Sequence, residues 1–236
     1  MRIAIMQPYF FPYLGHFSLI KHTDRFVIND AVQYIKQGWI ARNRILQQGQ
    51  GWTYINVPLM AHSQDTLIKD IMLHNKTNWK HKIMGQLRHY PNRPPHLKAV
   101  EQLCADIFSA DFDDIVSLNV SVLEGILAYL GIDREIEIFS KMHLEIEAPT
   151  DSDEWPLNIC KALGNIDEYW NPPGGKSFYD RNKFEQAGIK LCFHEIELNA
   201  YNQNAESFEP GLSILDAMMF HSPQEINQML DQYQIS

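Results

Sequence analysis

The sequence is poor in cysteine, lacks long apolar runs and carries no excess of positive charge. Its 3 cysteines are far apart and form no C-x-x-C pair, which indicates buried thiols in a reducing cytoplasm rather than a disulfide framework. No apolar run approaches the roughly 20 residues that a membrane-spanning helix needs. Gln7, Pro8 and Pro12 interrupt the apolar N-terminus too early for the core of a signal peptide. We therefore expect a cytoplasmic protein with no membrane partner.

The charge balance and the missing motifs exclude further classes of protein. Lys and Arg total 20 against 29 Asp and Glu, a net charge of −9, so we expect no nucleic-acid partner. The chain has no complete G-x-x-x-x-G-K-[ST] or G-x-S-x-G motif and no H-x-x-x-H pair. His81 and His89 would share a helix face, but two helical turns separate them by about 12 Å, too far for one ion. We expect no metal-binding site.

The composition is typical of one folded domain spanning residues 1–236, with 45% hydrophobic and 21% charged residues. Alternating strands and helices predict an α/β fold: a Rossmann-like, largely parallel sheet flanked by helices, with an inserted β-hairpin and a mostly helical middle segment. The strands are predicted at 2–6, 25–28, 44–46, 52–57, 66–73, 136–139, 168–170 and 189–193, with a turn at 47–51. The helices are predicted at 15–22, 79–90, 97–108, 114–130, 155–163, 182–187, 212–220 and 224–233.

Gly15 and His16 open the first predicted helix, directly after the first strand. A helix N-terminus binds phosphate well, and a histidine there can donate to phosphate oxygens. Alternatively, Gly15 only makes the turn and His16 only caps the helix, and the spacing by itself favours this second interpretation.

Polar residues gather after the second strand, where a parallel sheet presents its ligand crevice. Asp30 fits a base or a group that holds a substrate amine, although an Asn29-Asp30 turn explains the pair equally well. Arg42 and Arg44 lie close in the sequence to Lys36 and Trp39. This combination suits an anionic ligand that carries a stackable ring. A solvated basic turn is the alternative.

A second candidate phosphate site lies at residues 173–177, where Gly174 and Gly175 precede Lys176. Mobile backbone N–H groups beside a lysine suit an anion. A plain Gly-Gly turn is the alternative.

Several blocks of the chain resemble the WbqC-like family. They are Gln7 to Phe17, Phe26 to Asp30, Gln33-Tyr34, Trp39 to Ile45, Leu157 to Cys160, Gly174 to Tyr179, Tyr201 to Gln203 and Phe208 to Asp216. The resemblance implies a link to bacterial O-antigen and other surface-polysaccharide gene clusters. The run Leu14 to Ile20 is also similar, more distantly, to the H-x-G-H helix start of nucleotidylyltransferases and pantothenate synthetase. Gly15 and His16 match that motif, whereas Tyr13 stands at its first histidine.

These resemblances imply an enzyme, a transferase or an ATP-dependent amide ligase, that modifies an amino-sugar or related precursor of surface polysaccharide. The leading hypothesis is ATP-dependent activation of a small carboxylate followed by amide formation. The alternatives are a transferase that uses a pre-activated nucleotide-sugar or acyl donor without ATP, and a non-catalytic binding partner. ATP or a nucleotide-sugar, with Mg²⁺, is the expected cofactor, none of them tightly bound, and a small molecule is the expected partner.

Each group of site residues has an expected role. Catalysis is assigned to His16, Asp30 and Lys176. Nucleotide or phosphate binding is assigned to Gln7, Tyr13, Gly15, His16, Gly174, Gly175 and Lys176. Substrate binding is assigned to Gln33, Tyr34, Lys36, Trp39, Arg42, Asn43, Arg44 and Asp216. If the hypothesis holds, His16, Asp30, Arg42 and Lys176 should converge on one pocket.

Overall fold

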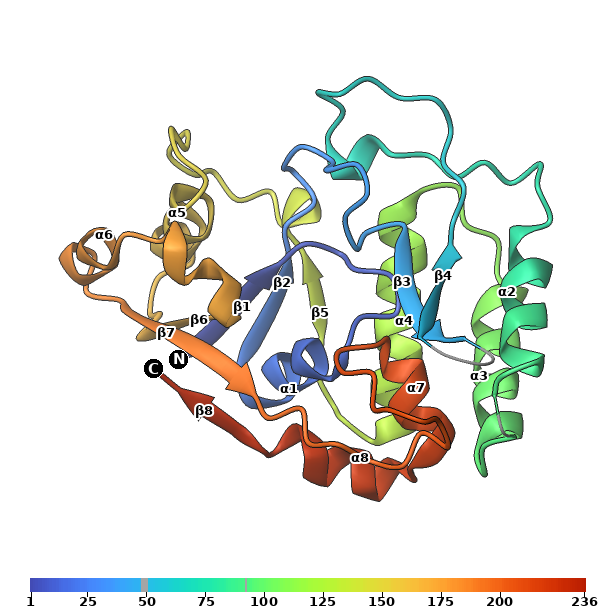
Figure 1. The fold of residues 1–236 in the computed structure, drawn as a ribbon. Helices are drawn as coiled ribbons and strands as arrows, with labels where there is room; N and C mark the ends of the chain where they lie inside the picture. Colours follow the sequence, from blue (N-terminus) through green and yellow to red (C-terminus); the bar gives the residue numbers. More distant parts are fainter. Residues whose placement is uncertain (48–50, 92) are drawn as a thin grey trace.

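The computed structural model describes residues 1–47, 51–91 and 93–236 and confirms a mixed α/β fold. Its main sheet has six strands in the order β5-β2-β1-β6-β7-β8, with a separate antiparallel pair β3-β4 beside it (Figure 1). The strands of the main sheet are β1 (Arg2–Met6), β2 (Arg25–Ile28), β5 (Ile136–Ile138), β6 (Glu168–Asn171), β7 (Lys190–Ile196) and β8 (Tyr233–Ile235). All neighbours pair in parallel except β8, which runs antiparallel to β7.

The strand order reverses between β1 and β6. From β1 the chain moves outward to β2 and β5, and it then returns to the other side of β1 to form β6 and β7. Such a reversal separates the loops that leave the two neighbouring strands, and it creates a crevice at their carboxyl ends. The topology therefore singles out the edge that follows Met6 and Asn171.

Alternating side chains on the strands face two apolar cores. Ile3 and Ile5 of β1 pack in the core that also holds α5 (Glu154–Leu163) and α6 (Arg181–Gln186). Ala4 faces the larger core on the opposite side of the sheet, where α1 (Leu14–His22) contacts α8 (Pro223–Leu230). A strand buried on both faces is the expected central element of a parallel sheet.

The inserted hairpin consists of β3 (Arg42–Leu46) and β4 (Trp52–Asn56). Its strand β4 packs with α2 (Trp79–Arg88), and β3 packs with α7 (Ile214–Phe220). In the helical middle segment α2 contacts α3 (Leu97–Ser109), which in turn contacts α4 (Ile115–Leu130). The clearest helix, α4, begins where the Asp114 side chain accepts a hydrogen bond from the backbone N–H of Ser117 at 2.8 Å. It ends at Gly131, whose φ of +68° is the left-handed conformation that favours glycine. The turn predicted at 47–51 lies partly outside the described residues.

Two expectations about secondary structure are wrong. Residues 66–73 do not form a strand: a 3₁₀ turn, η1 (Ile68–Asp70), interrupts them, and Leu67, Met72 and Leu73 make only isolated bridges to other segments. The last helix ends at Leu230, earlier than predicted, and β8 begins at Tyr233, inside the predicted helix. Backbone pairing with β7 decides this last strand, because hydrogen bonds to a distant segment leave no local pattern.

Two further 3₁₀ turns follow the carboxyl ends of strands: η2 (Phe139–Lys141) after β5 and η3 (Pro173–Ser177) after β6. Within the described residues, no helix has both the length and the apolar character that a membrane crossing requires.

Candidate ligand-binding site at the switch point of the sheet

A cavity of about 340 Å³ lies where the strand order reverses, beside the ends of β1 and β6. Its wall comes from the β1–α1 loop, the loop before β3, β3 itself, the end of β6 and the segment after β7. The lining residues are Met6, Tyr9, Pro12, Tyr13, Trp39, Asn43, Arg44, Pro172, Leu198 and Gly211. In open α/β sheets this edge is where ligands bind.

Two buried asparagine side chains fix the loop between β1 and α1. The amide of Asn43 donates hydrogen bonds to the carbonyl oxygens of Phe10 and Phe11, at 3.0 and 2.9 Å. The amide of Asn119, on α4, donates to the carbonyl oxygens of Pro8 and Ile40, at 2.8 and 2.9 Å. Because these bonds pair buried carbonyls that no regular element would satisfy, the loop is held in one conformation.

Tyr13 covers the N-terminal turn of α1. A Cβ added at Gly15 would lie 2.4 Å from ring atoms of Tyr13, so only a glycine leaves room for this ring. Burial raises the pKa of Tyr13, with smaller contributions from Tyr9 and Glu195, so the phenol stays neutral. The glycine therefore makes room for a side chain of the protein itself. The space over Gly15, at the start of α1, is filled by the Tyr13 ring.

His16 is completely buried, and its ring centroid lies 5.5 Å from that of Tyr9 and 5.3 Å from that of Phe26. Neither ring nitrogen has a hydrogen-bond partner among the described residues. Burial lowers the pKa of His16 to about 3, so the imidazole is neutral at pH 7. Tyr9, which lines the cavity, packs against this ring, and His16 does not belong to the cavity wall.

The hairpin presents a face of arginines and aromatic rings. The guanidinium carbon of Arg44 lies 5.3 Å from the ring centroid of Trp39 and 5.2 Å from that of Trp52. The guanidinium carbon of Arg42 lies 4.3 Å from the ring centroid of Tyr54. Each arginine donates a hydrogen bond to a backbone carbonyl: Arg44 to that of Gly211 at 3.1 Å, and Arg42 to that of Gln37. Only Arg44 lines the cavity.

Asp30 is buried at the end of β2 and serves a structural contact. Its carboxylate accepts hydrogen bonds from the backbone N–H of Ser140 at 3.0 Å and from the Ser140 hydroxyl at 2.5 Å. These bonds tie the end of β2 to the turn η2 that follows β5. The carboxylate does not line the cavity.

The remaining polar residues of the first predicted site lie around this edge. Gln7, directly after β1, is half-buried and does not line the cavity. The side chain of Gln33 donates to the carbonyl of Gln64 at 2.7 Å, and the ring of Tyr34 packs on that of His62. Lys36 is exposed.

The second predicted phosphate segment forms η3. A Cβ added at Gly175 would lie 2.5 Å from the side-chain oxygen of Asn171 and 2.6 Å from the ring of Tyr179, so this glycine is needed for packing. Gly174, in contrast, faces open space. The ammonium of Lys176 lies 3.8 Å from a carboxylate oxygen of Glu195, and both side chains are substantially exposed.

Asp216 is completely buried in α7, away from the cavity wall. Its carboxylate accepts hydrogen bonds from the hydroxyls of Tyr90 and Tyr201 and, at 2.7 Å, from the side-chain amide of Gln203. Burial raises the pKa of Asp216, and the three hydrogen bonds oppose that rise.

Ser213, just before α7, donates its backbone N–H to the Arg44 carbonyl at 2.8 Å. The Asp216 network thus anchors the segment that supplies the Gly211 wall of the cavity.

The structure brings together four residues assigned from the sequence: Tyr13, Trp39, Asn43 and Arg44. The four residues expected to converge, His16, Asp30, Arg42 and Lys176, do not line this cavity. Sequence reasoning missed Met6, Tyr9, Pro12, Pro172, Leu198 and Gly211 as wall residues. The aromatic and proline run after β1 was a signal for Tyr9 and Pro12. Leu198 and Gly211 carry no local signal, because only the fold brings their segment to the switch point.

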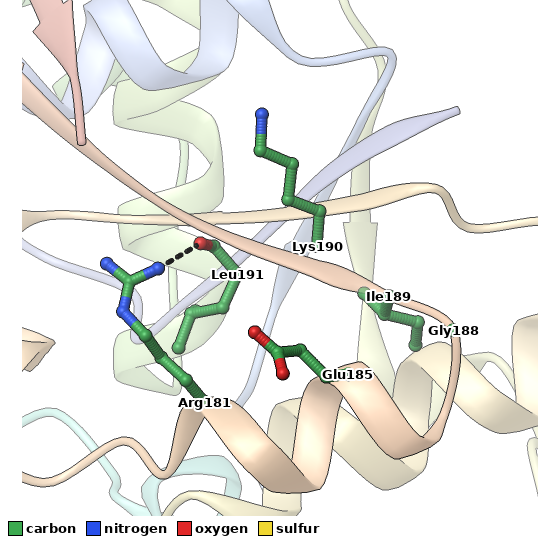
Figure 2. Close-up of a pocket in the computed structure, with 6 residues that line it drawn as sticks. All are labelled: Arg181, Glu185, Gly188, Ile189, Lys190 and Leu191. Carbon is green, nitrogen blue, oxygen red and sulfur yellow. Dashed lines mark hydrogen bonds between the residues drawn. The ribbon is translucent and has the colours of Figure 1, made fainter.

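A second pocket, of about 280 Å³, lies at the start of β7 (Figure 2). There Arg181 donates to the carbonyl of Leu191 at 3.1 Å, and Glu185 and Lys190 supply opposite charges. This pocket adjoins the amino end of a parallel strand, the edge where open α/β sheets do not bind their ligands. The cavity at the switch point is therefore the better candidate.

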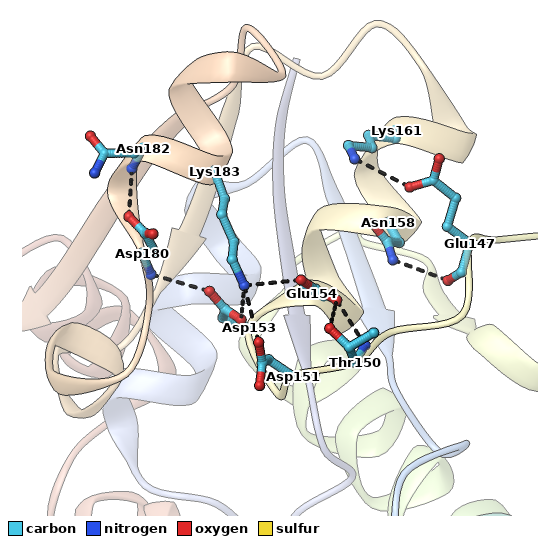
Figure 3. A network of polar contacts seen from close by, with 10 residues as sticks. All are labelled: Glu147, Thr150, Asp151, Asp153, Glu154, Asn158, Lys161, Asp180, Asn182 and Lys183. Carbon is cyan, nitrogen blue, oxygen red and sulfur yellow. Dashed lines mark hydrogen bonds and ion pairs between the residues drawn. The ribbon is translucent and has the colours of Figure 1, made fainter.

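Three carboxylates, those of Asp151, Asp153 and Glu154, lie close enough together to share an ion. The Lys183 ammonium already compensates their negative charge, because it lies 3.4, 3.1 and 3.0 Å from the three carboxylates (Figure 3). Hydrogen bonds from the backbone of Thr150 and from Lys183 lower the pKa of Glu154 to about 2. We interpret this network as a structural link between α5 and α6.

Comparison with known proteins leads to a family. The chain is 28% identical over 220 residues to the Uncharacterized protein Rv1507c of Mycobacterium tuberculosis, and the match covers 92% of each chain. No solved structure matches the chain significantly. The WbqC-like protein family matches residues 7–228, nearly the whole length. The chain therefore belongs to the WbqC-like protein family.

Proposed function

We propose that this protein is a biosynthetic transferase that modifies an amino-sugar or related precursor of surface polysaccharide, and that the substrate binds in the switch-point cavity. The observation that carries the proposal is the position of Arg44: a guanidinium on the cavity wall, beside the Trp39 ring, at the edge where α/β sheets bind ligands. A guanidinium recognises phosphate or carboxylate, and an indole face packs well against a sugar or a base. The resemblance to proteins of polysaccharide gene clusters supports the substrate class.

A pre-activated donor, used without ATP, suits the cavity best. In such a transfer the sugar nitrogen forms a bond to the acyl carbon, the bond from that carbon to its leaving group breaks, and the amine proton departs with the leaving group. This reaction needs substrate orientation more than phosphate stabilisation. The two aromatic rings that cover His16 and the start of α1 leave little room for a phosphate chain there.

ATP-dependent activation of a carboxylate followed by amide formation is the second candidate. It is favoured by the N-terminus of α1, which has neither a side-chain cap nor an acidic residue in its first turn. An uncapped helix N-terminus attracts anions. For ATP to contact it, however, the Tyr13 ring must move.

The test combines binding and turnover. Purified protein is incubated with glucosamine 1-phosphate and acetyl coenzyme A as a pre-activated acyl donor, or with ATP, Mg²⁺ and a panel of amino acids, and products are identified by mass spectrometry. An N-acylated sugar formed without ATP supports the proposal. Carboxylate-dependent exchange of pyrophosphate into ATP would replace it with the ligase. If neither occurs and a His16, Arg42, Arg44 and Lys176 quadruple variant still functions in cells, the protein is a non-catalytic partner.

A further inference from the structure

We propose that the ligand of the switch-point cavity carries one anionic group, a carboxylate or a phosphate monoester, that Arg44 binds directly and without a divalent cation. This inference rests on the proposed function, whose substrate class it narrows. It favours small sugar acids and sugar monophosphates over nucleotide-linked ligands, which carry a chain of phosphates.

Arg44 is a cation without a counter-charge. Among the described residues no carboxylate lies within 4.0 Å of its guanidinium, and its Nε is buried without a hydrogen-bond partner. One Nη group donates to the Gly211 carbonyl, which leaves most of the five N–H donors unused. A buried donor without a partner is costly, so a native structure that keeps one needs an explanation. The Nε atoms of Arg42 and Arg134 are also buried without a partner among the described residues, but of the three only Arg44 lines the cavity, where a bound anion would supply the partner.

The contacts around Arg44 restrict its guanidinium to one position before a ligand binds. The rings of Trp39 and Trp52 each lie within cation–π distance of it, at 5.3 and 5.2 Å. Gly211, which accepts its hydrogen bond, has a φ of +64°, a left-handed conformation that favours glycine. Because these contacts restrict the side chain before a ligand arrives, little conformational entropy is lost on binding.

The cavity supplies one positive charge. Among the described residues, no other cation and no carboxylate lines its wall. His16 is neutral and lies under Tyr9, and Lys176 already faces Glu195 outside the wall. A chain of two or three phosphates needs several cations, and the Mg²⁺ that usually accompanies it is held by carboxylates. This wall offers neither, whereas a single carboxylate or phosphate monoester matches one guanidinium.

The helix N-terminus cannot add its dipole as a second contact in this conformation. The Tyr13 ring fills the space over Gly15, which is the approach that a phosphate would use. The volume agrees: about 340 Å³ lies near the lower end of the roughly 300–1,000 Å³ range of ligand pockets. The largely apolar wall and the Trp39 ring suit a body the size of one sugar.

The experiment measures binding of four probes by isothermal titration calorimetry and by tryptophan fluorescence: glucosamine 1-phosphate, glucuronate, UDP-N-acetylglucosamine and ATP with MgCl₂. Each is titrated into the wild type and into R44Q and R42Q. Arg42 is the matched control, because it lies on the same hairpin face and also stacks on an aromatic ring, but it does not line the cavity. Circular dichroism checks that both variants fold.

We expect glucosamine 1-phosphate or glucuronate to bind, with the better of the two identifying the anionic group. R44Q should weaken that binding at least tenfold, R42Q less than threefold, and added Mg²⁺ or EDTA should have no effect. Tighter binding of UDP-N-acetylglucosamine or of Mg·ATP, a requirement for Mg²⁺, no loss in R44Q, or no binding of any probe would each overturn the inference. Arg44-dependent binding without any transfer product would defeat the proposed function and leave this inference intact. ATP-independent transfer that requires a nucleotide-linked sugar would do the reverse: it would support the proposed function and defeat this inference.

Discussion

Two cations of this protein differ in how their charge is compensated. Lys183 contacts three carboxylates in a network that joins α5 to α6 (Figure 3). Arg44, at the switch-point cavity, has two indole rings and one backbone carbonyl but no carboxylate among the described residues. The chain has 29 acidic residues against 20 basic ones, so acidic side chains are not scarce. The fold places them beside Lys183 and not beside Arg44.

The contrast distinguishes polar groups that have partners within the protein from polar groups that lack them among the described residues. Satisfied groups, such as the Lys183 carboxylates and Asp216, should contribute to stability and little to binding. Unsatisfied groups, such as Arg44 and His16, should contribute little to stability or even reduce it. Substitutions on both sides of this comparison test it.

The largest effect on stability is expected at Asp216. Replacing it with Ala leaves the donors of Tyr90, Tyr201 and Gln203 without their acceptor inside the protein. The free energy of unfolding should fall by about 3 kcal/mol. Urea denaturation followed by circular dichroism measures it. The D216N variant keeps an acceptor oxygen and should lose less, and a loss below about 1 kcal/mol in D216A would contradict the structural role.

A smaller loss is expected at Asp153 in the Lys183 network. Its buried carboxylate accepts from Lys183 at 3.1 Å and from the backbone N–H of Asp180 at 3.2 Å. D153A should lower the free energy of unfolding by about 2 kcal/mol and leave probe binding unchanged. Asp151 is the control, because its side chain is 70% exposed, and D151A should stay within about 0.5 kcal/mol of the wild type. If D153A and D151A had equal effects, burial of a carboxylate would not determine how much it contributes to stability in this network.

Replacing His16 should stabilise the protein, in contrast to the two aspartate substitutions. H16F replaces a buried imidazole, which has no hydrogen-bond partner among the described residues, by an apolar ring among aromatic neighbours. The free energy of unfolding at pH 7 should therefore rise by about 1 kcal/mol. H16L is a second variant in case the larger ring overpacks. Destabilisation by both variants at pH 7 would mean that His16 has a partner in the folded protein.

The same histidine gives a pH dependence with a defined sign. Its pKa is about 3 in the folded protein and near 6.5 in the unfolded chain, so between these values only the unfolded chain binds the proton. His16 adds no pH dependence to stability above pH 6.5, and below that value it lowers the free energy of unfolding by up to about 1.4 kcal/mol per pH unit. The advantage of H16F over the wild type should therefore widen from pH 7 to pH 4 in urea titrations. A constant difference would contradict this assignment.

The smallest effect on stability is expected at the cavity itself. R44Q removes cation–π contacts and one hydrogen bond, and it also removes an unpaired charge, so the free energy of unfolding should change by less than about 1 kcal/mol. R42Q should behave similarly, because Arg42 also lies against an aromatic ring, that of Tyr54, and donates to one backbone carbonyl. Thermal unfolding of both variants gives the values. A large loss of stability in R44Q alone would show that Arg44 has a structural role, as Lys183 does, and would contradict the contrast between them.

Much of the fold was readable from local pattern. Residues 2–6 and 25–28 are short apolar runs bounded by polar or turn residues, and both form strands at the predicted positions. Asp114 and Gly131 mark the ends of α4 by their capping chemistry. The strand β8 could not be predicted in this way, because pairing with β7 and not local sequence creates it.

The candidate site was readable only in part. Polar and aromatic residues after β1 and before β3 indicated a ligand site, and Tyr13, Trp39, Asn43 and Arg44 do line one cavity. The roles expected for His16, Asp30 and Lys176 depended on which way each side chain faces. Tertiary contacts with Tyr9, Ser140 and Glu195 decide that.

The family, the α/β class and the segments that surround the switch point can be predicted from the sequence, because hydrophobic periodicity, capping residues and motif blocks are local properties. Which charged groups are neutralised depends on tertiary contacts. Lys183 meets carboxylates about 30 residues away, at Asp151, Asp153 and Glu154, whereas Arg44 reaches a carbonyl 167 residues away and no acid among the described residues. Compensation of charge requires atoms within a few ångströms of each other, and the folded chain, not the order of its residues, sets those distances.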